Sequence, residues 1–396
     1  LKEQGKLSFL NVSIIGELGF ICNIETTNKT MIDYIFKAIS NQSNEISIAA
    51  SEAIGIMSIN SKQIYQAILD FADKKSNISW LFASKAMLKK LSKNSDNAKN
   101  LKSNIKTISN VLLSNADFHK ETSQTISEAL SYLLKINKKY ISKLIENAKN
   151  NSNSAPISIK AIGLYLQKVN DSKLLISTVK KVLSYLNPNS PILSESCIFC
   201  LKIAVSRNQS NISELMEYFP VACEYSKMKG EHVVVQYFGN QQVTQDIGRK
   251  LRLYAIETVM EYYNASSQIE FKKLINIIFS GLNDPYIEVR AKALDFLYIL
   301  ALNKDKKIDF VQNAVDIVEK LQEIEINQNE KESKNAFLSY LKSIFYIYKL
   351  VGKNEVPEVD KLYLKIKGIP ELENIEQDYK VNLSLYKSQS IKMNGK

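Results

Sequence analysis

The sequence predicts an all-α protein built from stacked pairs of helices, with a single β-hairpin inserted between two of them. Helical segments with small residues near their middle recur along the chain, and more polar amphipathic segments alternate with them. Only residues 231–246 have a strand-like pattern. The 7 Pro and 12 Gly among 396 residues suit helices that are joined by short turns.

Small residues between apolar ones mark the first set of predicted helices. These segments span 9–21, 46–59, 81–91, 122–134, 157–169, 194–205, 251–263, 287–301 and 336–350. Corresponding positions are Gly16, Gly55, Leu88, Ser131, Gly163, Leu201, Thr258 and Asp295, with steps of 39, 33, 43, 32, 38, 57 and 37 residues. Most steps are close to the period of HEAT and armadillo repeats. The fold class is therefore a HEAT/armadillo-like α-α superhelix (solenoid).

A second set of predicted helices is more polar and has apolar residues at i, i+3, i+4 and i+7, on one face of a helix. Examples are residues 30–40, 62–72, 174–186 and 271–282, and short turns at 187–191 and 283–286 connect helices. Glycine inside a helix costs about 1 kcal/mol relative to alanine. We interpret the mid-helix glycines as points where the next helix approaches closely, rather than as parts of a cofactor loop.

Residues 231–246 (EHVVVQYFGNQQVTQD) differ from the rest of the chain. Two runs of β-branched and aromatic residues flank Gly239-Asn240, as in a hairpin with a two-residue turn. The step of 57 residues exceeds its neighbours by about one hairpin, so this stretch is interpreted as an insertion. Strand alternation gives it two sides: Val233, Val235 and Tyr237 against Val234, Gln236 and Phe238.

Both sides of this hairpin are largely apolar, which implies two contacts, one on the helical stack and one elsewhere. A two-stranded hairpin is marginal alone in water, so the repeats or a partner must support it. An exposed apolar projection is typical of a partner site. The alternative is an insertion that lies flat on the stack without a partner.

Composition and motifs favour a binding protein over an enzyme. The chain is 45% hydrophobic and 23% charged, and no run of 18 apolar residues suggests a membrane span. We find no phosphate-binding loop, nucleophile elbow or metal-ligand cluster, so neither catalysis nor a cofactor is expected. Cys197-x-x-Cys200 is interpreted as two buried thiols on one helix face rather than a zinc or redox motif.

The net charge of +11 raises the alternative of nucleic-acid binding. The basic residues are 48 Lys and 4 Arg, however, and the lysines are spread over many helices. Bidentate recognition of bases and phosphates favours arginine. A solvated lysine-rich surface is therefore the preferred interpretation.

The predicted domain organisation is a solenoid of about nine helix pairs at 1–352, followed by a short helix and a frayed tail at 353–396. A polar connection is expected at 323–335. Because the chain begins at Leu1 without Met, we expect it to be part of a longer protein, and it has no recognisable signal peptide.

Four stretches carry a resemblance to a known family: LSFLNVSIIGELGF (7–20), ISIAASEAIGIMSIN (46–60), VTQDIGRKLRLYAIETVMEYY (243–263) and FSGLNDPYIEVRAKALDFLYILA (279–301). In order and spacing, the chain resembles the C-terminal third of the cullin-associated, neddylation-dissociated proteins (TIP-type HEAT-repeat proteins). The resemblance extends over essentially the whole chain, including IPELENIEQDY at 369–379. The hairpin tip and the thinner acidic stretch after it depart from the family pattern, which bears on adaptor selectivity.

The resemblance implies an assembly and exchange factor for cullin–RING ubiquitin ligases, found in cytoplasm and nucleus. The repeats would bind the N-terminal domain of a cullin that lacks the neddylation mark and carries its RING subunit. The hairpin would exclude the Skp-type adaptor of an SCF complex, and the protein itself would be a monomer. Partner-binding residues are then expected at Val233, Val234, Val235, Tyr237, Phe238, Gly239, Asn240, Val243, Asp284 and Tyr286.

Two other functions remain open at this point. A transcription- or nucleic-acid-associated helical scaffold would fit the positive charge, and its binding would weaken steeply with salt. A karyopherin-like transport scaffold would need an acidic inner surface, which the net charge disfavours.

Overall fold

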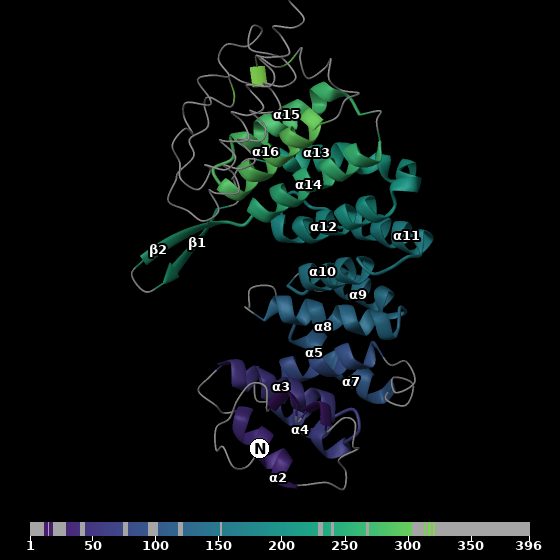
Figure 1. Cartoon of the computed structure of the whole chain (residues 1–396), viewed down its shortest axis with the longest axis vertical. Helices are drawn as coiled ribbons and strands as arrows, with labels where there is room; N and C mark the ends of the chain where they lie inside the picture. The colour runs from purple at the N-terminus through teal and green to yellow at the C-terminus, as the bar shows by residue number, and fades with distance from the viewer. Residues whose placement is uncertain are drawn as a thin grey trace, which may run out of the picture. The chain divides into compact units, whose positions relative to one another are not determined.

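The computed structural model describes residues 12–14, 16–18, 29–39, 44–73, 78–93, 102–117, 122–150, 153–228, 233–238, 241–266 and 269–302, together with 313, 316, 317 and 320. Helices account for nearly all of the regular structure in this part of the chain (Figure 1). The predicted connection at 323–335, the helix at 336–350 and the tail at 353–396 lie outside the described residues.

The chain forms two compact units, Leu1–Ala204 and Val205–Lys396. Helices of the first unit are α2 (Lys29–Ile39), α3 (Asn44–Met57), α4 (Lys62–Asp73), α5 (Ser79–Leu91), α7 (Lys102–Ser114), α8 (Ser123–Ile136), α9 (Tyr140–Asn150), α10 (Ala155–Leu166), α11 (Ser172–Leu183) and α12 (Pro191–Arg207), except for the last three residues of α12, which belong to the second unit. No described helix is long and apolar enough to cross a membrane.

The first unit repeats one packing pattern. Helices α3, α5, α8 and α10 contact one another in succession, and α4, α7 and α9 each lie between two of them in sequence and contact both. The predicted alternation of two helix types is thus reproduced in space. Apolar side chains fill the interface, among them Leu88, Leu130, Leu133, Ile159 and Ile162, all fully buried. This arrangement confirms the predicted all-α, HEAT-like repeat fold.

Close helix approach explains the mid-helix glycines, as predicted. A Cβ added at Gly55 would lie 2.0 Å from the carbonyl oxygen of Ala83 on α5. At Gly16 it would lie 2.6 Å from the Cβ of Ala53 on α3, and Gly163 faces α12 in the same way. These distances leave no room for a methyl group, so the glycines are required by packing.

The second unit contains the 3-10 helix η2 (Gln209–Tyr218), α13 (Phe219–Ser226), β1 (Val233–Phe238), β2 (Gln241–Asp246), α14 (Arg249–Ala265), α15 (Phe271–Leu282) and α16 (Ile287–Leu302). Helix α14 contacts η2, α13, α15 and α16, and so lies at the centre of this unit. The Tyr262 hydroxyl donates a 2.6 Å hydrogen bond to the Leu215 carbonyl oxygen, which connects α14 to η2.

Two helices of different type precede the hairpin. The residues up to Tyr218 belong to the 3-10 helix η2, and the α-helix α13 begins at Phe219. Pro220 lies in the first turn of α13, the position where a missing backbone N–H costs no hydrogen bond. The proline therefore sets the start of α13.

Candidate protein-binding site: the β-hairpin and its base

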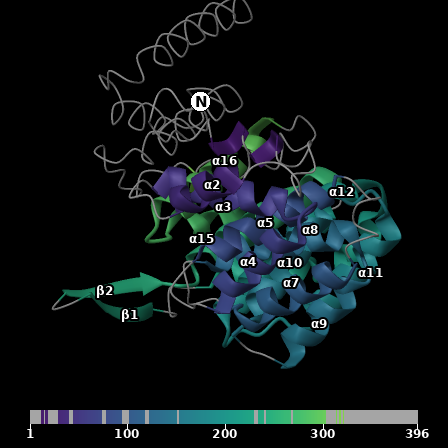
Figure 2. The same ribbon diagram turned by 90° about the horizontal axis from the view of Figure 1, so that it is seen from below.

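Strands β1 and β2 form the predicted antiparallel hairpin between α13 and α14, and they make the only sheet among the described residues. Val233 pairs with Asp246 and Phe238 pairs with Gln241, so the Gly239-Asn240 dipeptide connects the strands as predicted. The strands extend away from α14 (Figure 1), and they lie side by side in both views (Figures 1 and 2).

Asp246, the last residue of β2, anchors the hairpin to the helix that follows. It is 7% exposed. Its Oδ1 accepts a 2.7 Å hydrogen bond from the Gly248 backbone N–H, which fixes the turn into α14. Its Oδ2 accepts a 2.7 Å hydrogen bond from the guanidinium of Arg252, on the first turn of α14.

Arg252 joins the hairpin base to the turn between α15 and α16. It is 2% exposed, and its Nε and Nη2 donate to the two carboxylate oxygens of Asp284 at 2.6 and 3.3 Å. Burial alone would lower the pKa of Arg252, but hydrogen bonds and charges from Asp284 and Asp246 raise it above its ordinary value. The guanidinium therefore stays charged and is shared by two buried carboxylates.

The α15–α16 turn is itself held in place around this ion cluster. The Asp284 Oδ1 also accepts a 2.9 Å hydrogen bond from the Tyr286 backbone N–H. Arg290 donates to the carbonyl oxygen of Asp284 at 2.8 Å. The guanidinium carbons of Arg249 and Arg252 lie 5.3 and 5.9 Å from the centre of the Tyr286 ring, within the range of cation–π attraction.

The predicted site residues fall into two groups. Residues of the 233–238 run and Val243 lie on the hairpin strands, and Gly239 and Asn240 are outside the described residues. Asp284 is buried at the hairpin base, and Tyr286 is partly exposed beside it. The ion cluster connects Asp284 to the hairpin through Arg252 and Asp246. Contact of these residues with a partner stays a prediction.

Sequence analysis did not identify Asp246 and Arg252 as important for this site. A signal was available, because two of the four arginines, Arg249 and Arg252, lie within one turn directly after the hairpin. Arginine is the usual choice for a buried, bidentate ion pair. Its scarcity elsewhere makes this local concentration informative.

The cysteines of α12 are buried, as predicted. Cys197 and Cys200 are fully buried, and their thiols lie 3.4 Å from the carbonyl oxygens of Val182 and Ile159. Burial raises the pKa of both thiols, which makes them poor nucleophiles and poor metal ligands at neutral pH. Among the residues that the structure describes, no group of three or more His, Cys, Asp or Glu side chains is arranged to hold a metal ion.

Comparison with known proteins yields distant structural matches alone. No family model matches the chain, and no curated protein matches it. Two solved structures of the karyopherin Kap121p, one bound to the extreme C-terminus of the protein phosphatase Cdc14p and one bound to Pho4p, share 10% and 9% sequence identity with it, each with a TM-score of 0.26. These matches cover 90% of this chain but 53% and 52% of the karyopherin chains, so the chain spans about half their length. Similarity at this level assigns neither a family nor a partner.

Proposed function

We propose that this chain is a protein-binding helical repeat that holds a cullin N-terminal domain with its repeats and excludes the cullin's adaptor with its hairpin. The observation that carries the proposal is the hairpin, inserted into helical repeats and fixed at its base by the buried Asp246–Arg252–Asp284 cluster. The choice of a cullin rests on the resemblance of the sequence to cullin-associated, neddylation-dissociated proteins.

The base cluster is informative because buried ions are costly. Removing charged groups from water costs several kcal/mol per ion, and apolar residues of similar volume often stabilise a fold at least as well. What such a cluster adds is geometry, since the guanidinium holds two carboxylates in fixed positions. Here the fixed element is the C-terminal end of the hairpin, because Asp246 ends β2 and the guanidinium of Arg252 joins it to Asp284 in the turn between α15 and α16. A hairpin without a partner would gain little from this arrangement.

The strand register suggests which hairpin positions meet the partner. Val233 pairs with Asp246, and paired residues share a face, so the face of Val233 is also that of Asp246, whose carboxylate is directed to Arg252. By alternation, the opposite face carries Val234, Phe238 and Val243. We assign the partner contact to this second face.

In this mechanism the repeats supply most of the affinity for a cullin that lacks the neddylation mark and carries its RING subunit. The hairpin then occupies space that overlaps the site of the Skp-type adaptor, so that substrate-receptor modules exchange. The protein needs no cofactor for this and acts as a monomer, in the cytoplasm and the nucleus where cullin–RING ligases are assembled.

A competition assay tests the proposal. The 396-residue chain is added to a purified cullin–RING complex together with its adaptor, and adaptor release is measured. Replacing residues 233–245 with a short Gly-Ser loop keeps Asp246 and the base cluster, so the fold should be retained. We expect this variant to bind the cullin and to release no adaptor. Release equal to that of the parent would contradict the assignment of exclusion to the hairpin, and failure of the parent to bind any cullin would overturn the choice of partner.

Two matched variants test the assignment of the partner-binding face. Val234, Phe238 and Val243 are changed to Ser in one, and Val233, Val235 and Tyr237 in the other. Full burial of an apolar side chain contributes roughly 1.5–3 kcal/mol, so losing two or three should weaken adaptor exclusion by a few powers of ten. We expect that loss in the first variant and a smaller one in the second. Equal losses would contradict the assignment to one face.

A further inference from the structure

A group of lysines lies at one edge of the first unit. Helices α5, α8 and α10 contact in succession, and short connections to antiparallel helices make α8 and α10 run in the same direction. Lys135 is in the last turn of α8, and Lys93 and Lys168 follow the ends of α5 and α10. We call Lys93, Lys135 and Lys168 the lysine edge.

The three lysines are close enough to repel one another. The pKa of Lys135 is lowered to about 8, first by burial, then by the side chain and charge of Lys168, and then by the charge of Lys93. The Lys135 ammonium also lies over the Tyr132 ring, whose centre is 5.0 Å from Nζ. Among the residues that the structure describes, none of the three forms an ion pair with a carboxylate.

Elsewhere in the same interface, a lysine does have an acidic partner. Lys85 of α5 lies 3.4 Å from a carboxylate oxygen of Glu128 on α8. Helix C-termini attract cations, which accounts for one lysine at each helix end. It does not account for three lysines whose charges act on one another and lower the pKa of Lys135.

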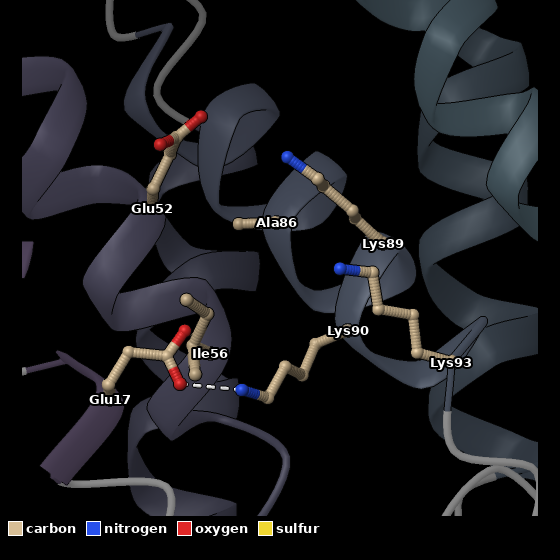
Figure 3. A pocket seen from close by; sticks show the side chains of 7 residues that line it. All are labelled: Glu17, Glu52, Ile56, Ala86, Lys89, Lys90 and Lys93. Carbon is tan, nitrogen blue, oxygen red and sulfur yellow. Dashed lines mark hydrogen bonds and ion pairs between the residues drawn. The ribbon is translucent and has the colours of Figure 1, made fainter.

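A pocket continues from the lysine edge toward α3. It has a volume of about 390 Å³ and is lined by Glu17, Glu52, Ile56, Ala86, Lys89, Lys90 and Lys93. In Figure 3 the lysines extend toward the pocket from one side and the two glutamates from the other, with Ile56 and Ala86 between them. Glu17 and Lys90 form a 2.5 Å ion pair across it. Lys93 belongs both to the pocket and to the lysine edge.

We propose that the lysine edge and this pocket together bind an extended acidic segment of a partner protein, with one apolar side chain seated on Ile56 and Ala86. An acidic segment provides carboxylates for Lys93, Lys135 and Lys168, none of which forms an ion pair within the described part of the chain. Glu17 and Glu52 favour a polypeptide over a nucleic acid, because they repel a continuous phosphate backbone entering the pocket, whereas an apolar side chain fits between the charges. This site is independent of the hairpin and of the cullin proposal.

The test uses the full chain and a fluorescent polyglutamate peptide with one central leucine. Changing Lys135 and Lys168 to Gln should weaken binding about tenfold, because two charge contacts are lost. The matched control changes Lys149 and Lys181, exposed lysines in the last turns of the antiparallel helices α9 and α11, and removes the same charge from the opposite helix ends. We expect the control to bind within about twofold of the parent. Equal weakening by both variants would mean general charge attraction and would overturn the proposal.

The pH dependence gives a second readout. As pH rises from about 7 to about 9, Lys135 loses its proton, so peptide binding to the parent should weaken. Lys135→Arg keeps the charge and should keep its affinity over this range. A peptide with serine in place of leucine should bind more weakly to the parent. Three results would each overturn the proposal. The first is the same pH profile for the parent and Lys135→Arg, and the second is equal binding of the two peptides. The third is tighter binding of a single-stranded oligonucleotide than of the peptide.

Discussion

Removing the positive charge at the hairpin base should strongly destabilise the second unit. In Arg252→Met, the side chains of Asp246 and Asp284, 3% and 6% exposed, would lose the guanidinium that lies 2.7 and 2.6 Å from them. Removal of one partner from a buried ion pair typically costs about 3–5 kcal/mol.

Calorimetric unfolding of the full chain measures this effect. We expect the transition of the second unit to fall by roughly 10 °C, because about 2–4 °C is lost per kcal/mol in a domain of this size. The control is Arg249→Met, one turn away on the same helix. Arg249 lies 3.0 Å from Glu288, but the side chains are 37% and 28% exposed, so this loss should cost less than about 1 kcal/mol.

A triple variant identifies the cause of the loss. In Asp246→Asn, Arg252→Met, Asp284→Asn the two carboxylates that lost their counter-charge are also removed, so this variant should be more stable than Arg252→Met alone. A single variant that unfolds within about 2 °C of the parent, or a triple variant no better than the single, would refute this reasoning.

Two further predictions concern the first unit and the cysteines. Gly55→Ala should destabilise the chain by about 1–3 kcal/mol in thermal unfolding, because the added Cβ would lie 2.0 Å from the Ala83 carbonyl oxygen. This is the opposite of the usual effect, since alanine normally favours a helix. An unchanged or raised unfolding temperature would contradict the packing role of Gly55. Burial raises the pKa of Cys223 to about 11, so at about pH 8 its reaction with a maleimide should be about a hundredfold slower than that of a free thiol in the denatured chain. Cys197 and Cys200 should not react until the chain unfolds. Rapid labelling of either of these two cysteines in the folded state would contradict their burial.

The sequence predicted those features that depend on periodic patterns. Apolar residues at helical spacing marked the helices, mid-helix glycines marked the close contacts, and Gly239-Asn240 between β-type runs marked the hairpin and its register. These features are local, or they repeat along the chain, so one sequence contains enough information to place them.

Features that depend on distant residues were missed. The Arg252–Asp284 contact joins positions 32 residues apart and has no sequence period. The lysine edge brings together residues at the ends of three helices, and nothing in the sequence distinguishes these three among the 48 lysines of the chain.

Hydrogen–deuterium exchange of the hairpin amides tests the central claim most directly. Peptides covering residues 233–246 and the helices of both units are compared in the free chain and in a complex with the cullin N-terminal domain. The proposed function predicts slower exchange of the 233–246 amides on binding, because a hairpin marginal by itself becomes ordered against its partner. Slower exchange confined to the helical repeats, with the hairpin unchanged, would contradict the assignment of the hairpin as the partner-binding element.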